Sequence, residues 1–241
     1  MELPQLGVNE KTPILKKNRL STGIPDLDVI MEGGYLNPGN VMLLGPTGGE
    51  KEALAHHFAA AADQKKEMVL IINADATPDS IREKAGAIGL DLKGPNVFFI
   101  DCYSQTLGQK KELQPTENCI YISGPGALND ISIALNEATK RSAGKRIRVI
   151  FHSLSTFVLY NPKESITKFL QVIEGRLKNA DATTLFMVEE GVHERQLLSL
   201  LEHGMDERLI LRETGGKFEL VVPAVDMAVP VKLGPSGITV V

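Results

Sequence analysis

Short apolar runs, each long enough for one buried strand, recur along this chain and constrain its fold more than any other feature. They are the segments 40–45, 68–73, 96–101, 119–123, 148–153 and 184–189. Longer stretches with helical spacing of apolar residues alternate with them, at 50–64, 77–89, 127–141, 164–179 and 193–203. Strands joined by crossover helices favour a mostly parallel sheet covered on both faces. The sequence therefore predicts an α/β fold, with Thr77 and Pro78 as the N-cap and first residue of one helix.

The pattern changes after about residue 205, where RLILRE, KFELVVP and GITVV follow one another with little helix between them. Such runs, separated by glycine turns, are typical of antiparallel strands added to one edge of the sheet. We expect a single domain over residues 1–241. Its parts would be an N-terminal arm (1–18), a core (19–212) and C-terminal strands (213–241).

Composition excludes several classes of protein. A hydrophobic content of 43% supports a large core, and a net charge of −4 gives no overall attraction to nucleic acid or an anionic membrane. No apolar run approaches the roughly 20 residues that span a bilayer, and the first residues lack a signal-peptide core. We expect a cytoplasmic protein in which Cys102 and Cys119 are buried thiols rather than disulfide or zinc residues.

The segment GPTGGEKEAL, residues 45–54, has the setting of a phosphate-binding loop, between a strand and a helix. In the pattern G-x-x-x-x-G-K-S/T, Gly45 and Lys51 match the first glycine and the lysine. Glu50 stands at the second glycine, where main chain approaches phosphate, and Glu52 stands at the hydroxyl that binds magnesium.

Both glutamates oppose nucleotide binding. Two unit charges about 4 Å apart interact by roughly 4 kcal/mol at an effective dielectric constant of about 20. Acidic residues in a first helical turn instead suit the helix dipole, so Glu50 or Glu52 could fill the anion nest itself. The alternative is an ordinary strand-turn-helix connection with solvated acids.

The segment from residue 19 to residue 54, RLSTGIPDLDVIMEGGYLNPGNVMLLGPTGGEKEAL, resembles the opening of KaiC-like proteins of the RecA superfamily. Asp28, Gly33, Gly34 and Gly39 match that pattern. The likeness continues through TPDSIREKAGAIGLDL, FFIDCYS and YISGPGALNDISIAL, which are similar to archaeal members, and covers most of residues 19–212. The resemblance implies a RecA-like P-loop NTPase core and assembly into dimers, rings or filaments.

The resemblance also allows the family's catalytic positions to be checked. Asp75 and Ala76 occupy the place of the glutamates that activate the attacking water, and His152 occupies the place of the aspartate that holds magnesium. Histidine is a poor partner for magnesium, which prefers oxygen. We expect no catalytic residue and a vestigial nucleotide site formed by Gly45, Gly48, Gly49, Glu50, Lys51, Glu52, Asp75 and His152.

Two arrangements of His152 are open. It could join Asp75, Glu50 and Glu52 around zinc or manganese. It could also hydrogen-bond Glu50 or Glu52 and close the vacated site, which we favour because no compact ligand motif is present.

Other segments suggest surfaces for partners. KRSAGKRIR, from Lys140 to Arg148, carries five basic residues that could contact nucleic acid, although solvated cations at a helix C-terminus are the simpler interpretation. The arm ELPQLGVNEKTPIL and the late strands could pair with another chain, or pack within their own subunit.

Together these features predict a catalytically inactive domain, without cofactor or bound metal, that regulates or scaffolds protein partners and self-associates. Nucleic acid and membrane binding are not expected. The alternative is a nucleotide sensor that binds ATP through Lys51 and Gly45 without hydrolysing it. A metal-dependent hydrolase built on His152, Asp75 and the loop glutamates is the third possibility.

Overall fold

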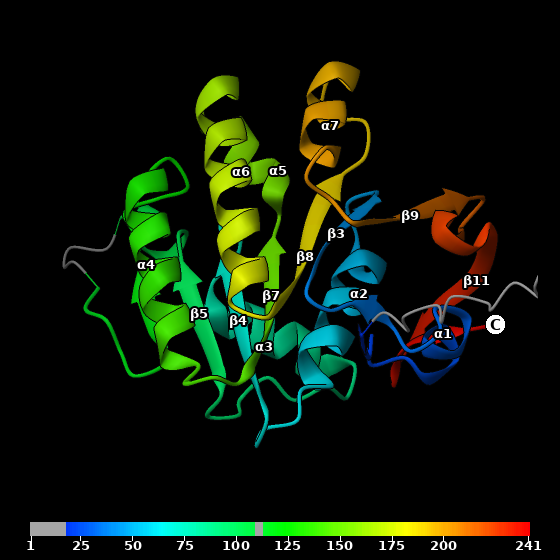
Figure 1. Cartoon of the computed structure of the whole chain (residues 1–241). Helices are drawn as coiled ribbons and strands as arrows, with labels where there is room; N and C mark the ends of the chain where they lie inside the picture. The colour runs from blue at the N-terminus through cyan, green and yellow to red at the C-terminus, as the bar shows by residue number, and fades with distance from the viewer. Residues whose placement is uncertain (1–17, 109–112) are drawn as a thin grey trace, which may run out of the picture.

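The computed structural model describes residues 18–108 and 113–241, and within them a large mixed sheet forms the centre of the protein (Figure 1). Its strands are β3 (Gly39–Gly45), β4 (Glu67–Asn73), β5 (Val97–Asp101), β6 (Cys119–Tyr121), β7 (Arg146–His152), β8 (Ala182–Glu189), β9 (Glu207–Thr214), β10 (Lys217–Val222), β11 (Met227–Gly234) and β12 (Gly237–Val240). They lie in the order β12-β11-β10-β9-β3-β8-β7-β4-β5-β6.

The sheet is parallel from β9 through β3 to β6, and β10, β11 and β12 continue it as an antiparallel edge. The predicted α/β class and terminal antiparallel strands are confirmed. The late strands pair with one another inside the subunit, as the simpler interpretation held. Most of the N-terminal arm, proposed as another pairing segment, lies outside the described residues.

Helices cover both faces of the sheet (Figure 1). On one face lie α1 (Pro25–Ile30), α2 (Gly49–Ala60) and α3 (Pro78–Ala87), and on the other α4 (Leu128–Arg141), α5 (Leu154–Leu159), α6 (Lys163–Asn179) and α7 (Arg195–Glu202). Short strands β1 (Arg19–Leu20) and β2 (Tyr35–Leu36) pair separately, and single 3-10 turns occupy Ser104–Leu107 and Pro223–Val225. None of the helices in the described part of the chain has the length and apolar character needed to cross a bilayer.

Local sequence signals explain the start of α3. Thr77 caps α3 by accepting a hydrogen bond from the Ser80 N–H at 3.2 Å, with Pro78 next, as predicted. Helix α5 was not predicted. Ser153 adopts a left-handed conformation, with φ of 64°, and turns β7 directly into this six-residue helix.

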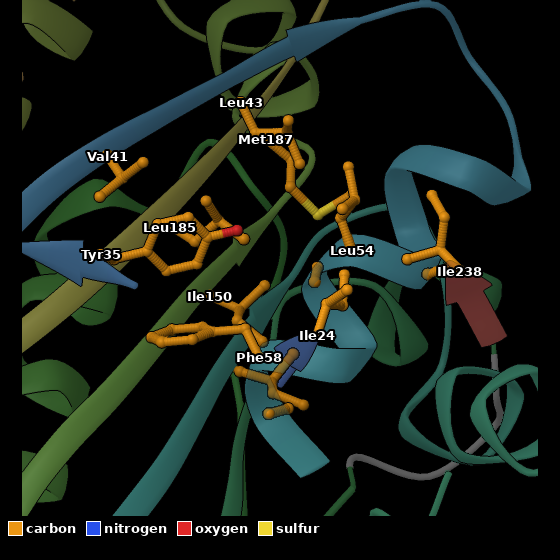
Figure 2. Close-up of a cluster of buried hydrophobic side chains, with 14 of the residues drawn as sticks. Ile24, Tyr35, Val41, Leu43, Leu54, Phe58, Ile150, Leu185, Met187 and Ile238 are labelled. Atoms are coloured by element: carbon orange, nitrogen blue, oxygen red, sulfur yellow. The ribbon is translucent and has the colours of Figure 1, made fainter. Parts of the chain in front are cut away.

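Buried side chains join the first elements of the chain to the last (Figure 2). Tyr35 and Phe58 are fully buried and meet edge to face, with ring centroids 5.2 Å apart. Leu54 of α2 and Ile238 of β12 belong to the same cluster. The C-terminal strands are therefore part of the core that supports α2.

A buried arginine ties this region together. Arg148 of β7 donates from Nε to Glu67 Oε2 at 2.7 Å, pairing β7 with β4. Its Nη1 donates to the carbonyl oxygens of Ser21 at 2.7 Å and Phe58 at 3.0 Å. One guanidinium thus fixes two strands, α2 and the segment before α1.

The segment before α1 explains why Asp28 and Gly34 occupy their positions in the pattern predicted from the sequence. Asp28 Oδ1 accepts from Thr22 N and Thr22 Oγ1, each at 2.7 Å, which closes the turn into α1. Gly34 has φ of +108°, and a Cβ there would lie 2.2 Å from the Leu20 carbonyl oxygen. Glycine is required at this position because any side chain would strike β1.

Replacing Glu67 with alanine should destabilise the protein strongly, because Arg148 would keep its charge in the core without a counter-ion. We expect a loss of about 3–5 kcal/mol in the free energy of unfolding, measured by urea denaturation. Glu137→Ala removes the exposed pair with Arg141 and should cost under about 1 kcal/mol. Similar losses in the two variants would contradict the role given to the buried pair.

Candidate functional site

The glycine-rich loop connects β3 to α2 as the sequence predicted. Gly45 ends β3 and Gly49 begins α2, with Gly48 as the N-cap residue. A Cβ on Gly45 would lie 2.9 Å from the Leu211 Cβ of β9, so the first glycine is also needed for packing. The strand-loop-helix geometry of a phosphate-binding loop is present.

Lys51 is directed into the protein. Its side chain is only 4% exposed, and Nζ donates to the carbonyl oxygens of Gly45 and Val188, each at 3.3 Å. Burial lowers the pKa of Lys51, and the nearby carboxylates of Glu189, Asp75 and Glu52 act in the opposite direction. The amine is held by main-chain acceptors at the ends of β3 and β8.

The hypothesis that a loop glutamate fills the anion nest is wrong for Glu52. Its carboxylate accepts from Lys84 Nζ of α3, at 2.8 and 2.9 Å. Glu50 Oε2 lies beside Gly48, 3.4 Å from where a Cβ would stand. Glu52 turns outward to a neighbouring helix. Among the described residues, no hydrogen bond joins the carboxylate of Glu50 or of Glu52 to a loop N–H.

His152 pairs with Asp75 rather than with Glu50 or Glu52, which corrects the sequence interpretation. Its Nδ1 lies 2.9 Å from Asp75 Oδ1. Strands β4 and β7 are neighbours and Asn73 is in register with His152, so the residues just beyond β4 reach it first. His152 is buried, and its Nε2 has no hydrogen-bond partner in the described structure.

The imidazole of His56, on α2, lies beside His152. The sequence analysis did not predict this contact. The rings of His56 and His152 stack at an interplanar angle of 17°, with centroids 6.4 Å apart. Burial, followed by the proximity of His152, lowers the pKa of His56 to about 3. His57 faces elsewhere, as expected for an adjacent residue, and its Nε2 accepts from the Ile238 N–H at 2.9 Å.

The metal alternative finds no support in this geometry. His152 and Asp75 meet, but Glu52 is paired with Lys84. Within residues 18–108 and 113–241, no three histidine, cysteine, aspartate or glutamate side chains are grouped as a metal site would require. A cavity of about 420 Å³ does adjoin the loop, with Thr47, Gly48, Gly49, Glu52, His56 and Lys84 among its lining residues.

Another polar contact at this end of the sheet was also missed. Ser155 Oγ of α5 lies 2.7 Å from His193 Nε2 and accepts from the Glu189 N–H at 2.8 Å. It joins α5 to the segment after β8. No local motif predicts it, because the residues come from separate crossover units.

The basic segment is largely structural. Arg148 is buried, and Arg146 contacts Glu67 at 3.1 Å. Arg141 pairs with Glu137 and lies over the Phe98 ring, 4.9 Å from its centroid. These contacts weaken the nucleic-acid interpretation, because three of the five cations already have partners in the subunit.

Comparison with known proteins shows which of them share the fold described above. The KaiC-like protein of Pyrococcus horikoshii has a solved structure that matches with a TM-score of 0.69 and 19% identity, over 93% of this chain and 99% of that one. This likeness shows a KaiC-like RecA-type fold, as the resemblance implied.

Sequence relatives agree with the fold. A UPF0273 protein of Pyrococcus furiosus is 24% identical over 208 residues, which are 83% of this chain and 81% of that protein. The circadian clock protein KaiC2 of Synechocystis is 35% identical over 79 residues, or 32% of this chain and 14% of KaiC2. Residues 38–211 match the model of a family of unknown function, DUF7504, and the chain belongs to that family.

The buried imidazole of His56 predicts a specific loss of stability in acid. Between its ordinary pKa of 6.5 and its native pKa of about 3, the unfolded chain binds a proton that the native protein does not. Stability is therefore lost as pH falls below about 6.5. The free energy of unfolding is measured in urea at about pH 7 and about pH 4. Between these two values it should fall by roughly 3 kcal/mol less in His56→Gln than in the unchanged protein.

The control for this measurement is His203→Gln, which removes an exposed imidazole. Its free energy of unfolding should change with pH as that of the unchanged protein does. An equal acid loss with and without His56 would contradict the burial argument.

Proposed function

We propose that this chain is a KaiC/RecA-like domain that does not hydrolyse nucleotide and acts by binding other protein chains, including its own copies. The proposal rests on the charged side chains Lys51 and Glu52 of the loop, which already have partners within the subunit. Lys51 Nζ is bonded to two carbonyl oxygens, and the Glu52 carboxylate is bonded to Lys84. A nucleotide would have to compete with contacts that already satisfy these charges.

The positions that would hold magnesium support the same proposal. His152 stands where the metal-binding aspartate is expected and is hydrogen-bonded to Asp75, the remaining acid of the water-activating pair. Phosphoryl transfer depends on the metal and on positioned charge together. An imidazole paired with a carboxylate supplies neither an oxygen ligand for magnesium nor a free base.

A protein partner is favoured by the apolar side chains at the carboxyl edge of the sheet. Leu107 follows β5 and is 53% exposed, whereas Leu159 and Tyr160 follow β7 through α5 and are 80% and 62% exposed. Val192, after β8, is 58% exposed. Exposed apolar groups beyond the carboxyl ends of β5, β7 and β8 are the kind of surface that another protein chain covers.

A second candidate is a nucleotide sensor that binds without hydrolysis. The cavity of about 420 Å³ beside Gly48 and Gly49 favours it, because Lys84 lines the same space. A nucleotide there would have to displace Glu52 from Lys84. Direct binding measurements separate the two candidates.

Titration with fluorescent MgATP, followed by anisotropy, tests the state of the loop. We expect no saturable binding in the micromolar range for the unchanged protein. The paired change Glu50→Gly with Glu52→Thr should raise affinity at least about tenfold, because it removes two anions from the phosphate position. Hydrolysis should stay absent, since Asp75, Ala76 and His152 are unchanged.

The matched control for the titration is Glu164→Thr, which removes an acid from the first turn of α6. It should give no gain in affinity. Micromolar binding by the unchanged protein would favour the sensor, and no gain from the paired change would weaken the interpretation of the loop as a disabled P-loop.

Self-association should depend on the apolar carboxyl edge. Leu159→Ser is expected to lower the apparent molar mass by light scattering at matched concentration, because it places a hydroxyl in the proposed interface. Val29→Ser changes an equally exposed apolar residue on α1 and should leave the mass unchanged. A strict monomer at all concentrations would count against self-association.

A further inference from the structure

A second cavity, on the other face of the sheet from the loop helix, lies between α6 and α7. Its volume is about 140 Å³. Leu170, Leu200 and Leu201 give it apolar walls, and Thr167, Gln171 and His203 add polar groups. Figure 1 shows α6 and α7 as neighbouring helices.

The acidic residue of this cavity is Glu174 of α6. The residue is buried, with only 7% of its surface exposed, yet its carboxyl group has no hydrogen bond or salt bridge with any other described residue. Lys178, one turn further along α6, is engaged elsewhere, because its Nζ donates to both carboxylate oxygens of Asp206 at 2.8 and 3.0 Å. The carboxyl oxygens keep some contact with solvent, and a bound cation would offset the free energy that partial burial costs a carboxylate.

The space in front of this carboxyl group depends on Gly204. A Cβ at Gly204 would lie 1.8 Å from Glu174 Oε2, so no other residue fits while Glu174 keeps its position. The Gly204 carbonyl oxygen accepts from Asn40 Nδ2 at 3.2 Å, which fixes the backbone at this point. The cavity is therefore bounded by a main chain that is held in place.

We propose that this cavity binds a small primary amine in its ammonium form, with the Glu174 carboxylate as counter-ion. The proposal is independent of the nucleotide loop. At about 30 Å³ for each water in the liquid, the volume corresponds to roughly four or five waters, which suits an amine of a few non-hydrogen atoms. The leucine walls suit a short alkyl chain, and a single carboxylate does not suit Mg²⁺ or Ca²⁺, which take several oxygen ligands.

The charges around the cavity set the dependence on pH. Burial, followed by the negative charge of Asp206, raises the pKa of Glu174 to about 7, and Lys178 acts in the opposite direction. His203 faces the same cavity from the end of α7. An alkylamine stays protonated well above this range. Amine affinity should therefore rise as pH increases through 7 and Glu174 ionises.

The experiment titrates the full chain with ethylammonium chloride by calorimetry, at constant ionic strength and at about pH 8 and about pH 6. We expect saturable binding at the higher pH that weakens at the lower one. Glu174→Gln should lower affinity at least about tenfold, because it removes the charge and keeps the shape. Gly204→Ala should also lower it, because the new Cβ would displace the Glu174 carboxylate.

Controls separate this site from general salt effects. Glu164→Gln, on the same helix but exposed, should bind ethylammonium as the unchanged protein does. Ethanol, a neutral molecule of similar size, and potassium chloride should give no saturable signal. Unaltered binding in Glu174→Gln, or no binding by the unchanged protein, would overturn the proposal, and neither result bears on nucleotide binding at the loop.

Discussion

The guanidinium group of Arg148 is the interaction on which the rest of the fold depends. It lies inside the parallel sheet, bonded to Glu67 on the next strand and to carbonyl oxygens of Ser21 and Phe58. It also lies over the Phe58 ring, 4.9 Å from the centroid. A charge in this place is tolerated only when an opposite charge and hydrogen-bond acceptors compensate for the lost water. Meeting that condition sets the position of α2 relative to the strands, and α2 carries Lys51 and His56.

Three charged residues at the loop end of the molecule also have partners within the subunit. Lys51 uses two main-chain oxygens, Glu52 uses Lys84, and Asp75 uses His152. A working phosphate site would leave donors free for its ligand. Here Lys51, Glu52 and Asp75 already have partners within the subunit, which is why we favour a role in protein binding over catalysis.

The sequence predicts the strands and crossover helices well because buried parallel strands are continuous apolar runs, as β4 and β8 are. It does not predict α5, a helix of six residues that starts at a left-handed turn where the Ser153 side chain caps the Thr156 N–H. Arg148 was grouped with its basic neighbours, although a cation in the middle of an apolar strand is a signal for a buried partner. The stacking of His56 on His152 could not be predicted from the sequence, because it depends on the packing of α2 over β7.

At the candidate site, the sequence identifies the residues but not their contacts. Lys51, Asp75 and His152 do lie together at the carboxyl ends of the strands, as the order of motifs implies. Which acid pairs with which base depends on side-chain directions after the strand ends, and Lys84 of α3 had not been considered. The vestigial nature of the nucleotide site stays a prediction until binding is measured.

The order of strands also bears on how the chain can fold as it is synthesised. Strand β3, near the beginning of the sequence, pairs with β8 and β9, which come more than 130 residues later by the registers Gly39 with Thr183 and Val41 with Glu207. His57 receives its donor only from Ile238, almost the last residue. The loop helix therefore cannot reach its final environment until the C-terminal strands have been synthesised and have left the ribosome.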